Sequence, residues 1–238
     1  MRFKLYFANY YLMKGTFISF EGIDSSGKKT QAEMLAKALK QMGYEVVELS
    51  FPAYNTTFGK IVAAYLRGEY GPKDSSPEIT ALLFAIDRYQ FKKAIEDSLK
   101  QRKIIICNRF TQSAMAFEGT MHEDKIGMMK WIEKVESRLP QPNLIIFVDM
   151  PIEASKKLME NREKKGYLKG KSKDILEEDL NFQNAVRKTY LEMAKRDKRW
   201  VVINCANRVG GDWEIRKPEE IHEDVLKFVR NFMRKQLQ

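Results

Sequence analysis

The sequence predicts an α/β fold, a five-stranded parallel sheet with helices on both faces. Five short apolar segments are typical of buried strands, and longer segments with helical spacing of apolar residues separate them. Strands that alternate with helices in this way form βαβ units, whose strands run parallel. A glycine-rich loop after the first strand supports the same class. The strands are expected at residues 17–20, 46–49, 104–107, 144–148 and 201–203.

The loop after the first strand is close to a phosphate-binding P-loop. Residues 20–31 read Phe-Glu-Gly-Ile-Asp-Ser-Ser-Gly-Lys-Lys-Thr-Gln, and the pattern is Gly, four residues, Gly-Lys and then Ser or Thr. Backbone N–H groups of such a loop and the following helix N-terminus bind phosphate, while the lysine neutralises charge. A glycine turn without a ligand is the alternative. We expect ATP binding by Gly22, Ile23, Asp24, Ser25, Ser26, Gly27, Lys28, Lys29 and Thr30.

Two helices follow from the apolar spacing. The first is expected over residues 29–42, ending at Gly43, a residue suited to a left-handed cap. The second begins at Ser76, with Pro77 in its first turn, and continues to about Lys100. Its apolar positions are Leu82, Leu83, Ile86, Tyr89, Ile95 and Leu99.

Phe84 and Arg88 lie four residues apart on the second helix and so share a face. An aromatic ring beside a guanidinium suits a nucleobase. The alternative is a packed aromatic side chain beside a solvated arginine.

A basic segment follows the fourth strand. Residues 161–173 hold six basic side chains and two glycines between helical stretches. A solvated loop is one interpretation. Because a P-loop is present in the same chain, we favour a lid over about residues 161–175, which would close over ATP and offset phosphoryl charge.

Composition limits the class of protein. The 238 residues suffice for one domain, expected over residues 14–238, and no Gly, Ser or Pro linker divides the chain. The net charge of +10 suits nucleotides, although nucleic acid is a rival. Cys107 and Cys205 lack metal spacing and indicate a reducing, cytoplasmic compartment. Residues 1–13 form an extension, either the product of an upstream start codon or an interface element; we expect no membrane or nucleic-acid partner.

Several motifs together resemble the thymidylate kinase family, from about Lys14 to the C-terminus. They agree with it in order and spacing. The resemblance implies a three-layer P-loop kinase fold, a homodimer, and ATP-dependent phosphorylation of dTMP to dTDP in dTTP synthesis. The motifs are residues 20–24, Phe51-Pro52, residues 83–88, Asn108-Arg109-Phe110 with Ser113 and Phe117, residues 174–183, and the last helix from Lys217.

The resemblance also implies roles for individual residues. Phe84 would stack on thymine, Arg88 would bond its far edge, and Asp24 would accept from the 3′-hydroxyl. Phe117 would crowd the 2′ carbon and favour deoxyribose. The remaining acceptor residues implied are Phe51 and Pro52 in the pocket wall, Ser113 near the polar edge of the base, and Asn108 beside the phosphates.

Lys28, Arg109 and Arg162 are the catalytic residues we expect. By resemblance, Arg109 bridges the acceptor phosphate and the transferred phosphoryl group. Some family members carry a catalytic arginine in the P-loop, and others supply cations from the lid. This loop has Ser25 and Ser26 there, so the lid must supply the cation. Arg162 is the candidate, and it would bind ATP either by stacking on adenine or by contacting the ATP phosphates, with Lys164 and Lys165 as alternates.

Three departures from the family pattern concern the phosphates. Lys29 replaces the magnesium-binding hydroxyl, Asn108 replaces an aspartate, and Tyr54 replaces an arginine. We therefore expect Mg²⁺ to bind as its complex with ATP, and we assign it no protein ligands. The Lys29 ammonium is expected to take over part of the electrostatic role of the metal at the phosphates. Glu118 is also foreign to the family. A kinase for another nucleoside monophosphate or a deoxynucleoside, an impaired relative and a non-catalytic nucleotide-binding or nucleic-acid-binding protein are the alternatives.

Overall fold

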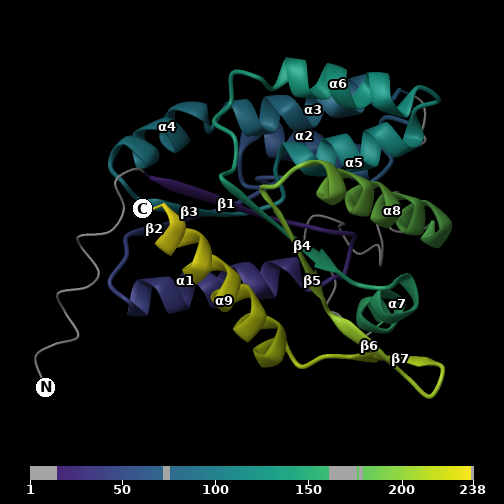
Figure 1. Cartoon of the computed structure of the whole chain (residues 1–238). Coiled ribbons are helices and arrows are strands. Elements are labelled where there is room, and N and C mark those ends of the chain that lie inside the picture. The colour runs from purple at the N-terminus through teal and green to yellow at the C-terminus, as the bar shows by residue number, and fades with distance from the viewer. Residues whose placement is uncertain (1–14, 72–75, 161–175, 177–178, 237–238) are drawn as a thin grey trace, which may run out of the picture.

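The computed structural model describes residues 15–71, 76–160, 176 and 179–236. Its centre is a five-stranded sheet in the order β2-β3-β1-β4-β5 with every neighbouring pair parallel (Figure 1). This confirms the predicted fold, and each predicted strand end lies within one residue of the observed end. The strands are β1 (Thr16–Glu21), β2 (Val46–Ser50), β3 (Ile104–Asn108), β4 (Leu144–Asp149) and β5 (Trp200–Asn204).

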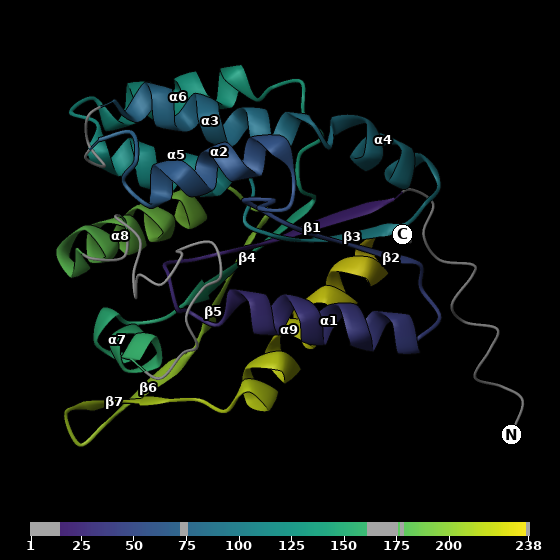
Figure 2. The same ribbon diagram turned by 180° about the vertical axis from the view of Figure 1, so that it is seen from behind.

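Helices cover both faces of this sheet, which gives three layers (Figures 1 and 2). One face is covered by α1 (Lys28–Gln41) and α9 (Pro218–Lys235). A shorter helix, α7 (Ile152–Glu160), lies near the edge of the sheet formed by β5. The opposite face is covered by α2 (Thr57–Leu66), α3 (Pro77–Tyr89), α4 (Lys92–Lys100), α5 (Thr111–Met121), α6 (Lys125–Val135) and α8 (Leu180–Arg196).

The central strands are buried on both faces, as a parallel sheet between helical layers requires. Along β1, Ile18 and Phe20 pack in the cluster with α1 and α9, whereas Phe17 packs in a cluster on the other face. Cys107 and Cys205 are buried free thiols. In the part of the chain that the structure describes, no helix is both long and apolar enough to cross a membrane.

The prediction of one helix from Ser76 to Lys100 is wrong, because α3 ends at Tyr89 and α4 begins at Lys92. Ser76 does cap α3, accepting from the Ile79 N–H at 3.3 Å. At the break, the Phe91 ring packs edge-on against Phe51, with centroids 5.3 Å apart. This contact in the apolar cluster stabilises the change of direction between the two helices.

The predicted apolar face of α3 is also partly wrong. Leu82 and Ile86 are 40% and 42% exposed, whereas Ala81, Ala85 and Arg88 are buried. Small side chains and an arginine therefore face the interior, since α3 packs directly on α5.

An antiparallel hairpin that the sequence analysis did not predict follows β5. It consists of β6 (Ala206–Val209) and β7 (Asp212–Ile215). The two turn residues, Gly210 and Gly211, have φ values of +58° and +95°. A two-residue hairpin turn of this kind needs positive φ at both positions, and glycine adopts it without steric cost.

Candidate nucleotide-binding site

A cavity of about 920 Å³ opens at the carboxyl ends of β1, β2 and β3. This edge is where ligands bind in open parallel sheets. Gly22 and Ile23 belong to the same loop but are not among the lining residues, and Arg162 lies outside the described residues. The lining contains every other residue predicted for the site: Asp24, Ser25, Ser26, Gly27, Lys28, Lys29, Thr30, Phe51, Pro52, Phe84, Arg88, Asn108, Arg109, Ser113 and Phe117.

The loop between β1 and α1 has the compact geometry of a phosphate cradle. Gly27 caps α1 with a φ of +88°, which glycine adopts without strain. A Cβ at Gly22 would lie 2.8 Å from both the Ser26 Oγ and the Val148 carbonyl oxygen, so the backbone path requires glycine there. The first residues of α1, Lys28, Lys29 and Thr30, line the cavity, so the N-terminus of this helix faces it.

Lys28 folds back over this loop. Its Nζ donates to the Ile23 carbonyl at 2.5 Å and to Ser26 Oγ at 3.3 Å, and its side chain is buried. The ammonium is therefore held where the loop would receive phosphate. Lys29 differs, because its side chain is 76% exposed and its Nζ lies 3.8 Å from Glu33 at the rim of the cavity.

Arg109 leaves β3 in a strained conformation and reaches across the site. Its φ is +65°, in the left-handed region that non-glycine residues rarely occupy. The guanidinium donates to Asp24 Oδ1 at 2.9 Å and to Ser113 Oγ at 3.0 Å, and lies 5.0 Å from the centre of the Phe117 ring. Three independent contacts thus fix one cation between the P-loop and α5.

Gln183 holds Asp24 from the other side. Its Nε2 donates to Asp24 Oδ2 at 2.9 Å, and its Oε1 accepts from the Asp24 N–H at 3.1 Å. The side chain is fully buried. No role was predicted for Gln183 from the sequence, although it lies in the family motif at residues 174–183.

Glu21, at the end of β1, is a second residue that the sequence analysis missed. It accepts from the Phe110 N–H at 2.9 Å and from Ser113 Oγ at 2.7 Å. Burial raises the pKa of Glu21 to about 7, against the lowering effect of Ser113 and Arg109. Because the Ser113 hydroxyl is engaged with Glu21 and Arg109, its predicted contact with a base edge stays a prediction.

Arg88 is fixed by Glu136, from the end of α6. Arg88 Nε and Nη2 donate to the two carboxylate oxygens at 2.6 and 2.5 Å, and both side chains are almost inaccessible to solvent. Thr111 Oγ1 donates to the same carboxylate at 2.8 Å. No pattern in the sequence pointed to Glu136, which lies 48 residues from its partner. Contact between Arg88 and a base stays a prediction.

The wall and floor of the cavity are also ordered by side chains. Asp87 Oδ2 accepts from the Ala53 N–H at 2.9 Å and so anchors the segment that contains Phe51, Pro52 and Tyr54. Asn108 donates through Nδ2 to Ser50 Oγ at 3.0 Å, while its buried Oδ1 has no partner among the described residues. An acceptor oxygen therefore remains available at the end of β3.

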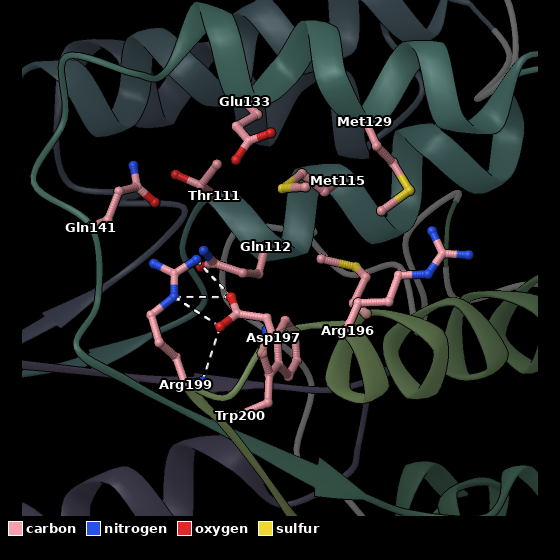
Figure 3. A pocket seen from close by; sticks show the side chains of 11 residues that line it. Thr111, Gln112, Met115, Met129, Glu133, Gln141, Arg196, Asp197, Arg199 and Trp200 are labelled. Carbon is pink, nitrogen blue, oxygen red and sulfur yellow. Dashed lines mark hydrogen bonds and ion pairs between the residues drawn. The ribbon is translucent and has the colours of Figure 1, made fainter.

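A second hollow, of about 280 Å³, lies beside α5, α6 and the end of α8 (Figure 3). Arg196 points along its rim, and Arg199 is bound by Asp197 at 2.7 Å. Met115 and Met129 form an apolar side. No glycine-rich loop lines this hollow, and Arg199, one of its two arginines, is already bound by Asp197. We therefore assign nucleotide binding to the larger cavity.

Comparison with known proteins gives a consistent result. A family model for thymidylate kinase matches residues 20–211. A probable thymidylate kinase of Pyrococcus abyssi is 31% identical, covering 92% of this chain and 98% of its own. Thymidylate kinases of Kosmotoga olearia and Plasmodium falciparum are 33% and 30% identical, covering 89% and 91% of this chain and 93% and 90% of their own.

The fold is shared with a solved structure as well. Thymidylate kinase from Candida albicans, described as having broad substrate specificity, superposes with a TM-score of 0.68. The two chains are 23% identical, and the match covers 94% of each.

The raised pKa of Glu21 predicts a pH-dependent stability. Between its usual pKa of 4.5 and about 7, folded protein binds more protons than unfolded protein, so wild-type stability falls as pH rises through this window. Glu21→Gln cannot ionise, and its unfolding free energy relative to wild type should increase by roughly 3 kcal/mol between pH 4.5 and 7.5. Urea denaturation at several pH values measures this, with the exposed Glu133→Gln as control. A pH-independent difference would contradict the assignment.

Proposed function

The chain belongs to the thymidylate kinase family, and we propose that the nucleotide cavity performs the family's reaction through the residues that line it. The protein is an enzyme that transfers the γ-phosphate of ATP to dTMP, giving dTDP and ADP on the path to dTTP. One observation carries the assignment of roles. One cavity is lined by the P-loop, by Phe84 and Arg88, which suit a nucleobase, and by Arg109.

The donor side is the P-loop. We propose that residues 22–30 bind the ATP phosphates through backbone N–H groups and the N-terminus of α1. Lys28, held at the loop by Ile23 and Ser26, would exchange those bonds for phosphate oxygens. The proposed lid cation, Arg162, lies outside the described residues and keeps its predicted role.

The acceptor side is the wall formed by α3, α5 and the segment after β2. We propose that thymine lies against Phe84 with Arg88 at its far edge, and that Asp24 accepts from the 3′-hydroxyl. Phe117 would exclude a 2′-hydroxyl. Support comes from the fixed orientation of Arg88 by Glu136. Phe51, Pro52, Asn108 and Ser113 complete the proposed lining.

Arg109 stands between the two sides. We propose that it bridges the acceptor phosphate and the transferred group, exchanging part of its bonding to Asp24 and Ser113 for phosphate oxygens. Phosphoryl transfer depends mainly on in-line positioning and on neutralising charge, so no protein base is required. An arginine that is already oriented loses little freedom when phosphate binds.

We propose that magnesium has no dedicated set of ligands on the protein. None of the described residues belongs to a cluster of three or more His, Cys, Asp or Glu side chains that could hold a metal. Lys29 stands in the hydroxyl position, and Asn108 offers one neutral oxygen where Mg²⁺ prefers carboxylates and phosphates. We propose that Mg²⁺ enters as the ATP complex and that the Lys29 ammonium supplies part of the positive charge at the phosphates.

We further propose that the protein is a homodimer formed through α3. Ile79, Leu82 and Ile86 are 61%, 40% and 42% exposed. Their spacing places them along one side of the helix, and such a contiguous apolar stripe favours protein contact.

We propose that the enzyme is cytoplasmic, because its two cysteines are buried free thiols. We also propose that residues 14–238 form one domain.

Turnover with a panel of acceptors tests the function. Purified protein with ATP and magnesium should convert dTMP to dTDP faster than dUMP, UMP, dCMP or thymidine. Arg109→Lys should lower kcat for dTMP by about 100-fold or more, because a single ammonium cannot replace the oriented guanidinium. Arg196→Lys, on the exposed surface, is the matched control. Absence of dTMP turnover by wild type would overturn the function; full activity of Arg109→Lys would overturn the role of Arg109.

The metal-site departures give a second prediction. Lys29→Thr combined with Asn108→Asp restores a hydroxyl and a carboxylate, so the rate at fixed ATP should depend more steeply on free Mg²⁺ than in wild type. The exposed Lys37→Thr on the same helix controls for loss of charge. Identical Mg²⁺ dependence in the double variant and wild type would count against Lys29 as a partial substitute for the metal.

The dimer proposal predicts that Leu82→Lys is monomeric, because it places a charge in the apolar stripe. Light scattering after size-exclusion chromatography measures the mass. Phe228→Lys on α9, where the native side chain is 44% exposed, should leave the dimer intact. A monomeric wild type, or a Leu82→Lys variant that stays dimeric, would contradict the proposed interface.

A further inference from the structure

Glu118 is an acid inside the nucleotide cavity for which the reaction supplies no role. It follows Phe117 on α5, its side chain is 1% exposed, and it lines the cavity together with Phe84 and Arg88. Its buried Oε2 has no hydrogen-bond partner among the described residues. An unpaired buried oxygen is costly, and native proteins seldom leave one unsatisfied. Its position in a ligand cavity indicates that a ligand completes its bonding.

The charges around Glu118 do not provide that partner. Arg88 on α3, Glu136 after α6 and Arg109 after β3 all interact with it electrostatically. However, Arg88 already gives two hydrogen bonds to Glu136, and Arg109 is bound to Asp24 and Ser113. Burial raises the pKa of Glu118 to about 8, against the lowering effect of Arg88 and Arg109. A carbonyl oxygen of the neutral acid or an oxygen of the carboxylate can accept a hydrogen bond.

The neighbouring groups define which ligand atom would donate. Phe84 presents the aromatic surface, and Arg88, whose bonds to Glu136 use Nε and Nη2, retains Nη1 donors. Thymine carries a ring N3–H directly beside a carbonyl oxygen. A guanidinium that donates to the carbonyl and a carboxyl that accepts from the adjacent N–H are complementary to this edge.

We propose that Glu118 determines base specificity by accepting a hydrogen bond from the ring N3–H of the acceptor nucleotide. This inference rests on the proposed function and adds a residue that recognises the N3–H group of the base. A site built to satisfy a ligand N–H discriminates strongly against an analogue that lacks it, because the buried oxygen is then left unpaired.

N3-methyl-dTMP provides the probe, since it keeps both carbonyls and loses only the N–H. Steady-state kinetics with dTMP and N3-methyl-dTMP should be measured for wild type, Glu118→Leu and Glu118→Gln. In Glu118→Leu the KM for dTMP should rise at least 10-fold with kcat changed less. The ratio of kcat/KM for dTMP over N3-methyl-dTMP should fall at least 10-fold relative to wild type.

Glu118→Gln is the conservative variant, because its amide oxygen can accept from N3–H at every pH. It should keep the ratio within about fivefold of wild type, and the KM for ATP should change little in either variant. A structural role alone would alter the KM for ATP and thermal stability without changing the ratio. An unchanged ratio in Glu118→Leu would overturn the inference while dTMP turnover upholds the function; no wild-type turnover of dTMP would overturn the function itself.

Discussion

The fixing of Arg109 is the interaction on which the site depends. Its backbone occupies the left-handed region at φ +65°, a conformation that costs of order 1–3 kcal/mol and persists only where surrounding contacts impose it. Here Asp24 and Ser113 bind the guanidinium, and Glu21 and Gln183 hold those two partners in turn. The P-loop, β3, α5 and α8 are thereby joined at one cation.

Oriented charge of this kind suits phosphoryl transfer, in which the protein contributes positioning and electrostatic stabilisation rather than covalent chemistry. Arg88 is held in the same way at the end of the cavity proposed for the nucleobase, where it donates two hydrogen bonds to Glu136. Each arginine lines the cavity and is held by a carboxylate, Asp24 for Arg109 and Glu136 for Arg88, so binding does not require ordering a flexible side chain. Glu118 differs from those carboxylates, because its Oε2 has no protein partner among the described residues.

Local patterns in the sequence predicted the strands and the P-loop, since those features depend on neighbouring residues. Most of the other residues that line the cavity were predicted only from the resemblance to the family. The partners that fix the site could not be predicted. Gln183 lies 159 residues from Asp24, and nothing in the sequence relates the two. The break between Tyr89 and Lys92 coincides with a tertiary contact of Phe91 with Phe51, which helical spacing does not predict. The hairpin was detectable, because Gly210-Gly211 between short extended segments is a turn signal.

A crystal structure with dTMP and a non-hydrolysable ATP analogue would show whether one cavity orients donor and acceptor around Arg109. We expect the analogue's phosphates on residues 22–30, the dTMP phosphate against Arg109, and the thymine ring against Phe84 with N3 within hydrogen-bond distance of Glu118. A nucleotide bound in the smaller hollow beside α8, or an acceptor phosphate out of reach of Arg109, would contradict this arrangement.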